Sequence, residues 1–303
     1  MKIHAVFNRD GGTFRTMDIK LFAKTAKEIF EKHGHTFESE IVPGKSVVKT
    51  LQKVASEVGE HVLMAGGGDG TISAAADVAW KAKVPLAVLP AGTMNLFARA
   101  LKIPLDINVA LESLASGTIQ AVDISTANEE SFVHQFSIGF QPQMIKLRNT
   151  LEYRSRWGKR LASIRAFAKA MGNPPRFAVR LVIDGIPTER TVSAISISNN
   201  PYGSGVLPVP DNVDHGELGV YVAGGLTPGA IVKLAFSVLT GSWRRNPDVD
   251  EILAKDVELH FPHLRRGAKA TIDGELIPLA RDVKIAIHVG ELQVLVPQVR
   301  LSI

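Results

Sequence analysis

Apolar and polar positions along the first part of the chain predict strands and helices in alternation. Short apolar runs predict strands at residues 3–7, 37–42, 62–65 and 84–89. Apolar positions with helical spacing predict helices at residues 17–33, 46–58 and 72–80, and the start of another at residues 95–101. This alternation favours a Rossmann-like α/β domain of three layers, in which helices cover both faces of a parallel sheet. Ligands of such domains bind beyond the carboxyl ends of the strands.

The pattern changes after about residue 123, where shorter strands with polar–apolar alternation follow one another. These strands are predicted at residues 132–138, 178–183, 192–198, 218–222, 256–261, 269–272, 283–288 and 292–296. Gly, Pro or Asp residues bound many of them, which is typical of an antiparallel sandwich or barrel. Helical segments are predicted to interrupt it at residues 143–171 and 227–240. We therefore expect an α/β domain at residues 1–123 and a β-rich domain at residues 124–290.

The composition limits the kinds of functional site and partner that the chain can have. The 303 residues are 45% hydrophobic, which supports a substantial core. The absence of cysteine excludes disulfides, thiolate nucleophiles and cysteine-based metal sites. The first residues predict a strand instead of a signal peptide, and no apolar run reaches the ~20 residues needed to span a bilayer. The net charge of +5 favours an anionic partner, either a nucleotide, a nucleic acid or an anionic membrane surface.

The strongest candidate for chemistry is the sequence GGGDGT at residues 66–71, between a predicted strand and a predicted helix. Glycines let the backbone approach an anion closely, and the amides at the N-terminus of the following helix point toward it. We therefore expect a phosphate-binding loop. Asp69 would repel a phosphate, so we expect it to act through a bound cation or a hydrogen-bond network.

A second glycine turn between a strand and a helix lies at residues 89–99, in the sequence LPAGTMNLFAR. Thr93 and Asn95 are suited either to capping that helix or to binding a ligand. From these residues alone, a helix cap is the preferred interpretation. Two such corners in the same part of the chain favour a nucleotide site.

Two Asp-Gly pairs in the β-rich part of the chain have the same local pattern. Asp-Gly is most often a hairpin turn, and Asp184-Gly185 is interpreted as a plain turn. A carboxylate on a tight turn can also act as a general base. Asp273-Gly274 therefore admits both interpretations.

Other local patterns are weaker. The sequence GKS at residues 44–46 looks like the end of a Walker A loop, but the earlier glycine of that motif would fall on Ser39. Neither H-E-x-x-H nor G-x-S-x-G is present. Basic residues interleaved with aromatic and apolar ones crowd one predicted helical segment, at Lys146, Arg148, Arg154, Arg156, Lys159, Arg160, Arg165 and Lys169. A solvated helix face, a patch for anionic lipid headgroups and an RNA-binding surface are all open there, in that order of preference.

Four motifs together resemble the diacylglycerol kinase catalytic-domain family, which includes sphingosine and ceramide kinases and the bacterial soluble lipid kinases. The sequence NRDGG at residues 8–12 is similar to the N-P-x-x-G loop of the family, with Arg9 in place of proline. GGDGT at residues 67–71 matches its G-G-D-G-T, and PAGTMN at residues 90–95 matches its P-x-G-T-x-N. DGE at residues 273–275 matches its late D-G-E. The motifs occur in the family's order along nearly the whole chain.

The resemblance implies a fold and a site. The fold is an N-terminal Rossmann-like α/β domain, which residues 291–303 are candidates to complete, and a C-terminal antiparallel β-sandwich-like domain, as in NAD kinases and diacylglycerol kinases. ATP and Mg²⁺ are implied as cofactors in the cleft between the domains. Asp273 is implied as the base that accepts a proton from a lipid hydroxyl, with Glu275 beside it. The implied nucleotide-binding residues are Asn8, Gly11, Gly12, Gly67, Gly68, Asp69, Gly70, Thr71, Thr93 and Asn95.

The resemblance also implies metal ligands. Asp69 is implied in the network of the nucleotide's Mg²⁺. Leu96 stands where many members have an aspartate. A structural Mg²⁺ is implied near residues 210–218, with candidate ligands at Asn212, Asp214, His215 and Glu217. His215 occupies the position of the family's aspartate, and histidine is a poor ligand for Mg²⁺.

The leading hypothesis is an ATP-dependent lipid kinase that transfers the γ-phosphate of ATP to a hydroxyl of diacylglycerol or a related lipid. It would act in the cytoplasm in peripheral contact with an anionic membrane, with no nucleic-acid partner, and a homodimer is left open. One alternative is a NAD kinase, although the asparagine–glutamate segment of that family is missing. Another is a non-catalytic regulator that binds a nucleotide or a lipid.

Overall fold

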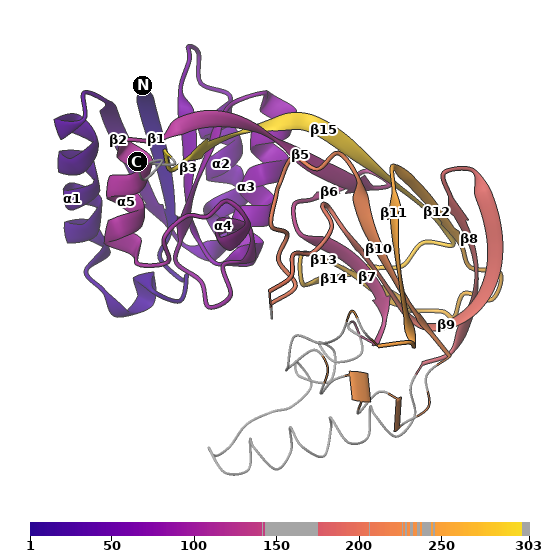
Figure 1. Cartoon of the computed structure of the whole chain (residues 1–303). Helices are drawn as coiled ribbons and strands as arrows, with labels where there is room; N and C mark the ends of the chain where they lie inside the picture. Colours follow the sequence, from indigo (N-terminus) through magenta and orange to yellow (C-terminus); the bar gives the residue numbers. More distant parts are fainter. Residues whose placement is uncertain are drawn as a thin grey trace, which may run out of the picture. The chain divides into compact units, whose positions relative to one another are not determined.

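The chain divides into two compact units (Figure 1). The first comprises Met1–Ile124, Asn212–His215 and His288–Ile303, and the second comprises Ser125–Asp211 and Gly216–Ile287. This computed structural model describes residues 1–140, 142, 175–205, 207–225, 227, 229–230, 233–234, 237, 244 and 246–298.

The first unit contains a parallel sheet with the strand order β15–β4–β3–β1–β2. Its strands are β1 (Lys2–Asn8), β2 (Thr36–Val42), β3 (Val62–Gly67), β4 (Leu86–Pro90) and the end of β15 (Asp282–Val296). Every residue of β3 and β4 is buried, as expected for strands covered on both faces. Phe7 pairs with Gly66, and Gly66 pairs with Leu89. The carboxyl ends of these three strands therefore lie together at one edge of the sheet.

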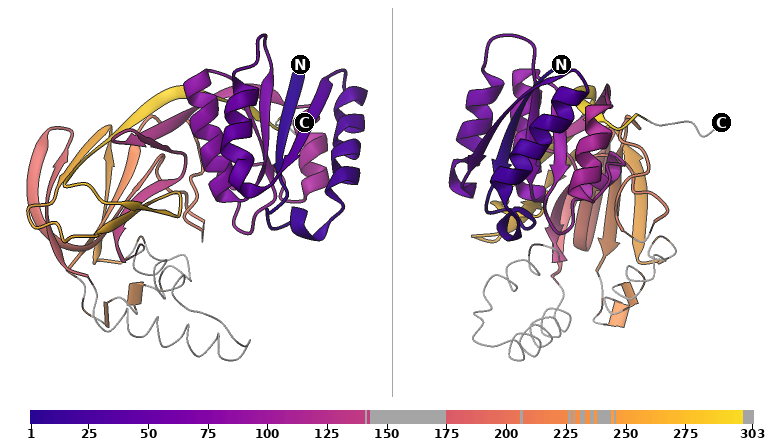
Figure 2. Two further views of the ribbon diagram at one scale, coloured as in Figure 1. Left: turned by 180° about the vertical axis from the view of Figure 1, so that it is seen from behind. Right: turned by 90° about the vertical axis from the view of Figure 1, so that its left-hand side faces the viewer.

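Helices cover both faces of the parallel sheet (Figure 2). They are α1 (Ile19–Lys32), α2 (Val47–Ala55), α3 (Asp69–Ala82), α4 (Leu96–Ala100) and α5 (Ile107–Ala115), with short 3₁₀ turns at Phe14–Thr16 and Gly44–Ser46. Helix α1 packs with α5, and α2 packs with α3. Asp18 caps α1 by accepting two backbone amides of its first turn. The buried Phe22, Ala26 and Phe30 lie on one face of that helix.

The second unit is antiparallel. Its strands are β6 (Glu130–Phe132), β7 (Gln135–Gly139), β8 (Phe177–Ile183), β9 (Ile186–Ser198), β10 (Leu218–Gly224), β11 (Val249–Ala254), β12 (Asp256–His260), β13 (Lys269–Ile272) and β14 (Glu275–Pro278), with the end of β5 (Thr118–Ala127) and the start of β15. Strand β9 pairs with β8 along its first half and with β7 and β10 along its second half. A hydrophobic cluster in the core of the unit includes Phe136, Leu181, Ile195 and Leu259.

The predicted fold class is confirmed, with differences in single elements. Residues 132–138, predicted as one strand, are divided between β6 and β7. Residues 283–288 and 292–296, predicted as two strands, belong to the single strand β15. Helix α5 and strands β5, β11 and β14 were not predicted.

The two predicted helical insertions are described unequally. Residues 143–171 lie outside the described residues. Within 227–240, the described positions 229–230, 233–234 and 237 are helical. In the part of the chain that the structure describes, no helix is both long enough and apolar enough to cross a membrane.

Candidate active site

The glycine loop lies at the carboxyl edge of the parallel sheet, where β3 ends and α3 begins. Gly68 is the N-cap of α3, and Asp69 is the first of its 14 residues. Backbone amides and the helix dipole at such an N-terminus attract anions. A Cβ added at Gly67 would lie 2.6 Å from the Thr71 Cβ, so a larger residue would push the strand and helix apart. Glycine therefore keeps the loop close to the helix N-terminus.

The second glycine corner, after β4, packs against the first. A Cβ added at Gly92 would lie 2.6 Å from the Gly68 Cα. The Asn95 side chain closes this corner, because its Oδ1 accepts the Gly92 N–H (2.8 Å) and its Nδ2 donates to the Gly92 carbonyl (3.0 Å). Asn95 itself has the left-handed φ of 51°, which asparagine tolerates better than most residues. Thr93 is exposed in the same turn.

Asp69 joins the two corners by hydrogen bonds. Its Oδ2 accepts the Asn95 N–H (3.1 Å), and its Oδ1 accepts the Leu96 N–H (2.7 Å). Leu96 begins α4, so Asp69 caps that helix from across the loop. Of the two interpretations of Thr93 and Asn95, the helix cap is not observed, since Asn95 occupies the N-cap position without a side-chain cap bond. Of the two roles expected for Asp69, the hydrogen-bond network is observed and the cation stays a prediction.

Asn8, at the end of β1, contacts the glycine loop from the neighbouring strand. Its Nδ2 donates to the Thr71 Oγ1 (2.9 Å), and its Oδ1 accepts the Asp10 N–H (3.0 Å). The Asp10 Oδ2 in turn accepts the Gly44 N–H (2.7 Å). The amide of Gly11 donates to the Asn8 carbonyl (2.9 Å). Asp10, within the NRDGG motif, thus ties the loop after β1 to the turn after β2.

The structure brings the predicted nucleotide-binding residues of the first unit together. They lie in the loops after β1, β3 and β4, which the pairing of these strands places side by side. Gly12, Gly70 and Thr93 are exposed at this edge. Their contact with ATP stays a prediction.

In the second unit, Asp273 lies in the turn between β13 and β14. Asp273 (φ 47°) and Gly274 (φ 87°) both have left-handed backbones, as in a two-residue hairpin turn. The Asp273 carboxylate accepts hydrogen bonds from three consecutive backbone amides, those of Val133 (3.1 Å), His134 (2.9 Å) and Gln135 (2.9 Å). A carboxylate held in this way is oriented before a substrate arrives.

Asp184-Gly185 forms the corresponding turn between β8 and β9. Its φ angles are 46° and 83°. The Asp184 Oδ1 accepts the amides of Lys255 (3.0 Å) and Asp256 (3.1 Å). The turn interpretation is therefore confirmed for both Asp-Gly pairs.

The segment that binds Asp273 is held by buried polar side chains. The Gln135 Oε1 accepts hydrogen bonds from the Ser196 Oγ (2.9 Å) and from the Tyr202 hydroxyl. The Tyr221 hydroxyl accepts the Tyr202 N–H (2.8 Å), and the two rings stack at 4.7 Å. Burial raises the pKa of Tyr202 far above its ordinary value and raises the pKa of Tyr221 to about 12. Both phenols therefore remain hydrogen-bond donors at neutral pH.

These polar residues were not predicted from the sequence. The available signal was the polar pair His134-Gln135 inside an otherwise apolar strand segment, because a buried polar side chain requires a partner. Glu275, which was predicted, is the exposed first residue of β14 and pairs with Ile272. Its participation in catalysis stays a prediction.

The predicted ligands of a structural metal lie between β9 and β10. Asn212, Asp214 and His215 are exposed, and the carbonyl of Val213 between them accepts the Asp123 N–H (2.8 Å). Among the described residues, no three His, Asp or Glu side chains are grouped so that they could hold a metal ion. A structural Mg²⁺ at Asn212, Asp214, His215 and Glu217 therefore stays a prediction without a matching cluster of donors.

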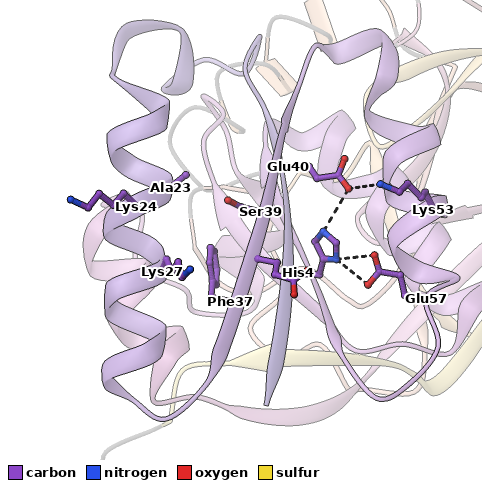
Figure 3. Close-up of a pocket in the computed structure, with 10 residues that line it drawn as sticks. His4, Ala23, Lys24, Lys27, Phe37, Ser39, Glu40, Lys53 and Glu57 are labelled. Carbon is purple, nitrogen blue, oxygen red and sulfur yellow. Dashed lines mark hydrogen bonds and ion pairs between the residues drawn. The ribbon is translucent and has the colours of Figure 1, made fainter.

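A pocket of about 690 Å³ lies over β2 and includes none of the predicted site residues (Figure 3). Its centre is the buried His4, whose Nδ1 lies 3.1 Å from Glu57 and whose Nε2 lies 3.7 Å from Glu40. The Lys53 Nζ lies 2.9 Å from Glu40. Burial alone would raise the pKa of Glu57, but the hydrogen bond and charge of His4, with the charge of Lys2, lower it below its ordinary value. These charges neutralise one another, so we interpret the cluster as structural.

Two family models match the chain. Residues 2–127 match the diacylglycerol kinase catalytic domain. Residues 145–296 match the YegS C-terminal NAD kinase beta sandwich-like domain. The first of these models, with the glycine corners, defines a phosphotransferase that acts on an alcohol group. The chain belongs to the diacylglycerol kinase catalytic-domain family, which confirms the predicted resemblance.

Individual relatives are distant. A diacylglycerol kinase of Mycobacterium tuberculosis is 27% identical over 283 residues, which cover 88% of this chain and 87% of the relative. An uncharacterized protein of Synechocystis is 27% identical over 244 residues, and the match covers 77% of this chain but only 55% of that relative. The chain therefore spans about half the length of the cyanobacterial protein.

Solved structures share the fold. The crystal structure of a diacylglycerol kinase from Bacillus anthracis has a TM-score of 0.68 at 17% identity and covers 97% of this chain and 96% of its own. A second crystal structure from the same organism has a TM-score of 0.76 at 19% identity, with coverages of 97% and 95%. At such identities the similarity supports the fold and not a particular substrate.

Proposed function

We propose that the chain is an ATP-dependent lipid kinase that transfers the γ-phosphate of ATP to a hydroxyl of diacylglycerol or a related lipid at a membrane surface. The observation that carries the proposal is the pair of glycine corners joined by Asp69 at the N-terminus of α3. A close-packed backbone at a helix N-terminus suits the phosphates of a nucleotide. Family membership and the name of the M. tuberculosis relative support a lipid as the acceptor.

The proposed chemistry uses Asp273 as the base. Asp273 accepts the proton of the lipid hydroxyl while the hydroxyl oxygen forms a bond to the γ-phosphorus. The bond between that phosphorus and the β,γ-bridging oxygen breaks, and ADP leaves. The three amides at residues 133–135 support this role because they fix the direction of the carboxylate. Glu275 supplies a second carboxylate two residues after Asp273.

The residues of the first unit fit a magnesium ion that arrives with the nucleotide. Mg²⁺ is usually held by one or two carboxylates together with the phosphates of the substrate, and Asp69 supplies a carboxylate at the glycine loop. When bound, the ion neutralises charge that develops on the transferred phosphoryl group. Asp69 itself keeps the two glycine corners together through its two amide hydrogen bonds.

Action at a membrane surface is supported by charge. The chain has a net charge of +5 and a segment at residues 146–169 in which basic and aromatic side chains are interleaved. Each basic residue close to an anionic surface contributes about 1 kcal/mol of attraction. This segment lies outside the described residues, so its support comes from the sequence.

The test is a transfer assay with the purified full chain. ATP radiolabelled in its γ-phosphate is supplied with Mg²⁺ and anionic vesicles that carry diacylglycerol, monoacylglycerol, sphingosine or ceramide. We expect label in at least one lipid, and loss of that transfer in Asp273→Ala. Phosphorylation of NAD in place of every lipid would identify a NAD kinase. Binding of ATP without transfer to any acceptor would identify a regulator, and either result would overturn the proposal.

A further inference from the structure

We propose that Gln135 is a positioning residue for Asp273, a role that rests on the proposed function of Asp273 as the base. The Gln135 side chain contacts two hydroxyl groups, and its backbone N–H and carbonyl both contact Asp273. The residue thereby links the buried interior of the second unit to the turn that carries the base.

The backbone contacts form a closed pair. The Gln135 N–H donates to the Asp273 Oδ1 (2.9 Å), and the Gln135 carbonyl accepts the Asp273 N–H (2.9 Å). The carboxylate of Asp273 also accepts the amides of Val133 and His134. Any displacement of the backbone at Gln135 therefore displaces both the main chain and the carboxylate of Asp273.

The side-chain contacts fix that backbone in the interior. Gln135 is only 9% exposed, and its Oε1 accepts the hydroxyls of Ser196, on β9, and Tyr202, in the loop after β9. Tyr202 is held in turn by the Tyr221 hydroxyl and by stacking on the Tyr221 ring. The two hydroxyl groups come from separate segments and donate to the same side-chain oxygen. They therefore define the position of the Gln135 side chain and, through it, the position of the start of β7.

The chemistry of glutamine assigns it a positional role. Its amide does not titrate, so it cannot exchange a proton with a substrate. A base must lie within hydrogen-bond reach of the proton that it accepts, and a misplacement of about 1 Å can cost about 100-fold in rate. Loss of the Gln135 side-chain bonds is therefore expected to lower the rate of the chemical step without altering the binding of ATP in the first unit.

The decisive variant is Gln135→Met, which keeps the length of the side chain and removes its hydrogen-bond acceptor. We expect kcat for lipid phosphorylation to fall about 10- to 100-fold, with KM for ATP unchanged within about twofold. Tyr202→Phe and Ser196→Ala remove one donor each and should give smaller losses of kcat. If Gln135→Met does not fold, the kcat of Tyr202→Phe decides instead.

The control is Ser137→Ala. Ser137 lies two residues further along β7, and its Oγ is hydrogen-bonded to the buried Thr271 Oγ1 (2.8 Å) on β13. This variant also removes a buried hydrogen bond between β7, which carries Gln135, and β13, which precedes the Asp273 turn, so it should lower Tm but leave kcat within about twofold. An equal loss of kcat in Ser137→Ala and Gln135→Met at equal Tm would overturn the positioning role.

Hydrogen exchange separates this inference from the proposed function. In Gln135→Met, the amides of residues 133–135 are expected to exchange faster than in the wild type, whether or not a lipid is phosphorylated. If the wild type transfers no phosphate, the proposed function fails, and the exchange rates alone decide the structural claim. Unchanged exchange at these three amides, or a wild-type kcat in folded Gln135→Met, would overturn the inference.

Discussion

The two Asp-Gly turns of the second unit have nearly the same backbone and different surroundings. The φ angles are 47° and 87° at Asp273-Gly274 and 46° and 83° at Asp184-Gly185. Both carboxylates accept backbone amides of a neighbouring segment. The amides at Asp273 belong to buried residues, of which His134 is 7% exposed, whereas those at Asp184 belong to exposed residues.

The comparison separates the effect of the turn itself from the effect of the segment that it contacts. In both places the turn directs a carboxylate toward the next segment and ties the hairpin to it. At Asp273 the partner segment is fixed by the buried side chain of Gln135, which accepts two hydroxyl hydrogen bonds. Each substitution at Asp273-Gly274 therefore has a matched control at Asp184-Gly185, with the same backbone and the same kind of hydrogen bond.

The largest effect is expected from removing the carboxylate that we propose as the base. Asp273→Asn keeps a side chain that tolerates the left-handed backbone, but an amide is a far weaker base, so kcat should fall about 10²- to 10⁴-fold. Asp184→Asn should leave kcat within about twofold, because it changes only the hydrogen bonds between that hairpin turn and residues 255–256. Steady-state kinetics of both variants test the comparison, and comparable losses of kcat would remove the distinction between the turns.

The glycines of the two turns should have equal effects on stability and unequal effects on rate. Gly274→Ala and Gly185→Ala each place a Cβ on a left-handed backbone, at a cost of about 1–2 kcal/mol in the free energy of unfolding. Only Gly274→Ala should also lower kcat, since it displaces Asp273. Urea unfolding and kinetics on the same samples check both statements, and an unchanged kcat in Gly274→Ala would contradict the second.

Asp69 extends the comparison to the first unit. Asp69→Ala removes the cap of α4 and should cost about 1 kcal/mol of stability while raising KM for ATP. The control is Asp106→Ala, which removes the cap of α5, where the carboxylate accepts two amides at 3.0 Å. It should cost a similar amount of stability and leave KM for ATP unchanged. Equal values of KM in the two variants would remove Asp69 from the nucleotide site.

The smallest effect concerns Glu57, whose carboxylate is bound to a side chain instead of to amides. Its folded pKa lies below the ordinary value of 4.5, so its contribution to stability is present above that value and is lost as the pH falls through the folded pKa. The contribution should be about 1 kcal/mol or less. Glu57→Gln should flatten the fall in unfolding free energy that occurs as the pH drops below 4.5. An unchanged pH dependence in Glu57→Gln would contradict this.

The parallel sheet could be predicted because its signals are local. Strands β3 and β4 are buried along their whole length and appear in the sequence as uninterrupted apolar runs. Two missed elements are too short to show a clear hydrophobic period: strand β14 has four residues and helix α5 has nine. Asp106, which caps α5, was the available signal for the start of that helix. Strand β15 was divided because Gly290 resembles a break. The structure accommodates it within the strand at a φ of 67°.

The site could be predicted only as far as its motifs are local. The glycine corners could be recognised because phosphate-binding loops need glycine at fixed positions. The partners of Asp69 lie 26 and 27 residues away, and those of Asp273 lie about 140 residues away, where no local pattern indicates them. The same partners explain the division of residues 132–138 into β6 and β7, because the amides of Val133 and His134 bind the carboxylate of Asp273.

Strand β15 gives the first unit a particular order of assembly. Val294 and Leu295 pair with Leu86 and Ala87 of β4, and the Trp80 Nε1 donates to the Glu291 Oε2 (2.9 Å) beside them. During synthesis, the ribosome must translate the whole second unit before β4 can receive this neighbour. The first unit is therefore begun first and completed last, with contacts of high sequence separation. A chain that stops at residue 287 should show faster hydrogen exchange in β4 than the full chain does.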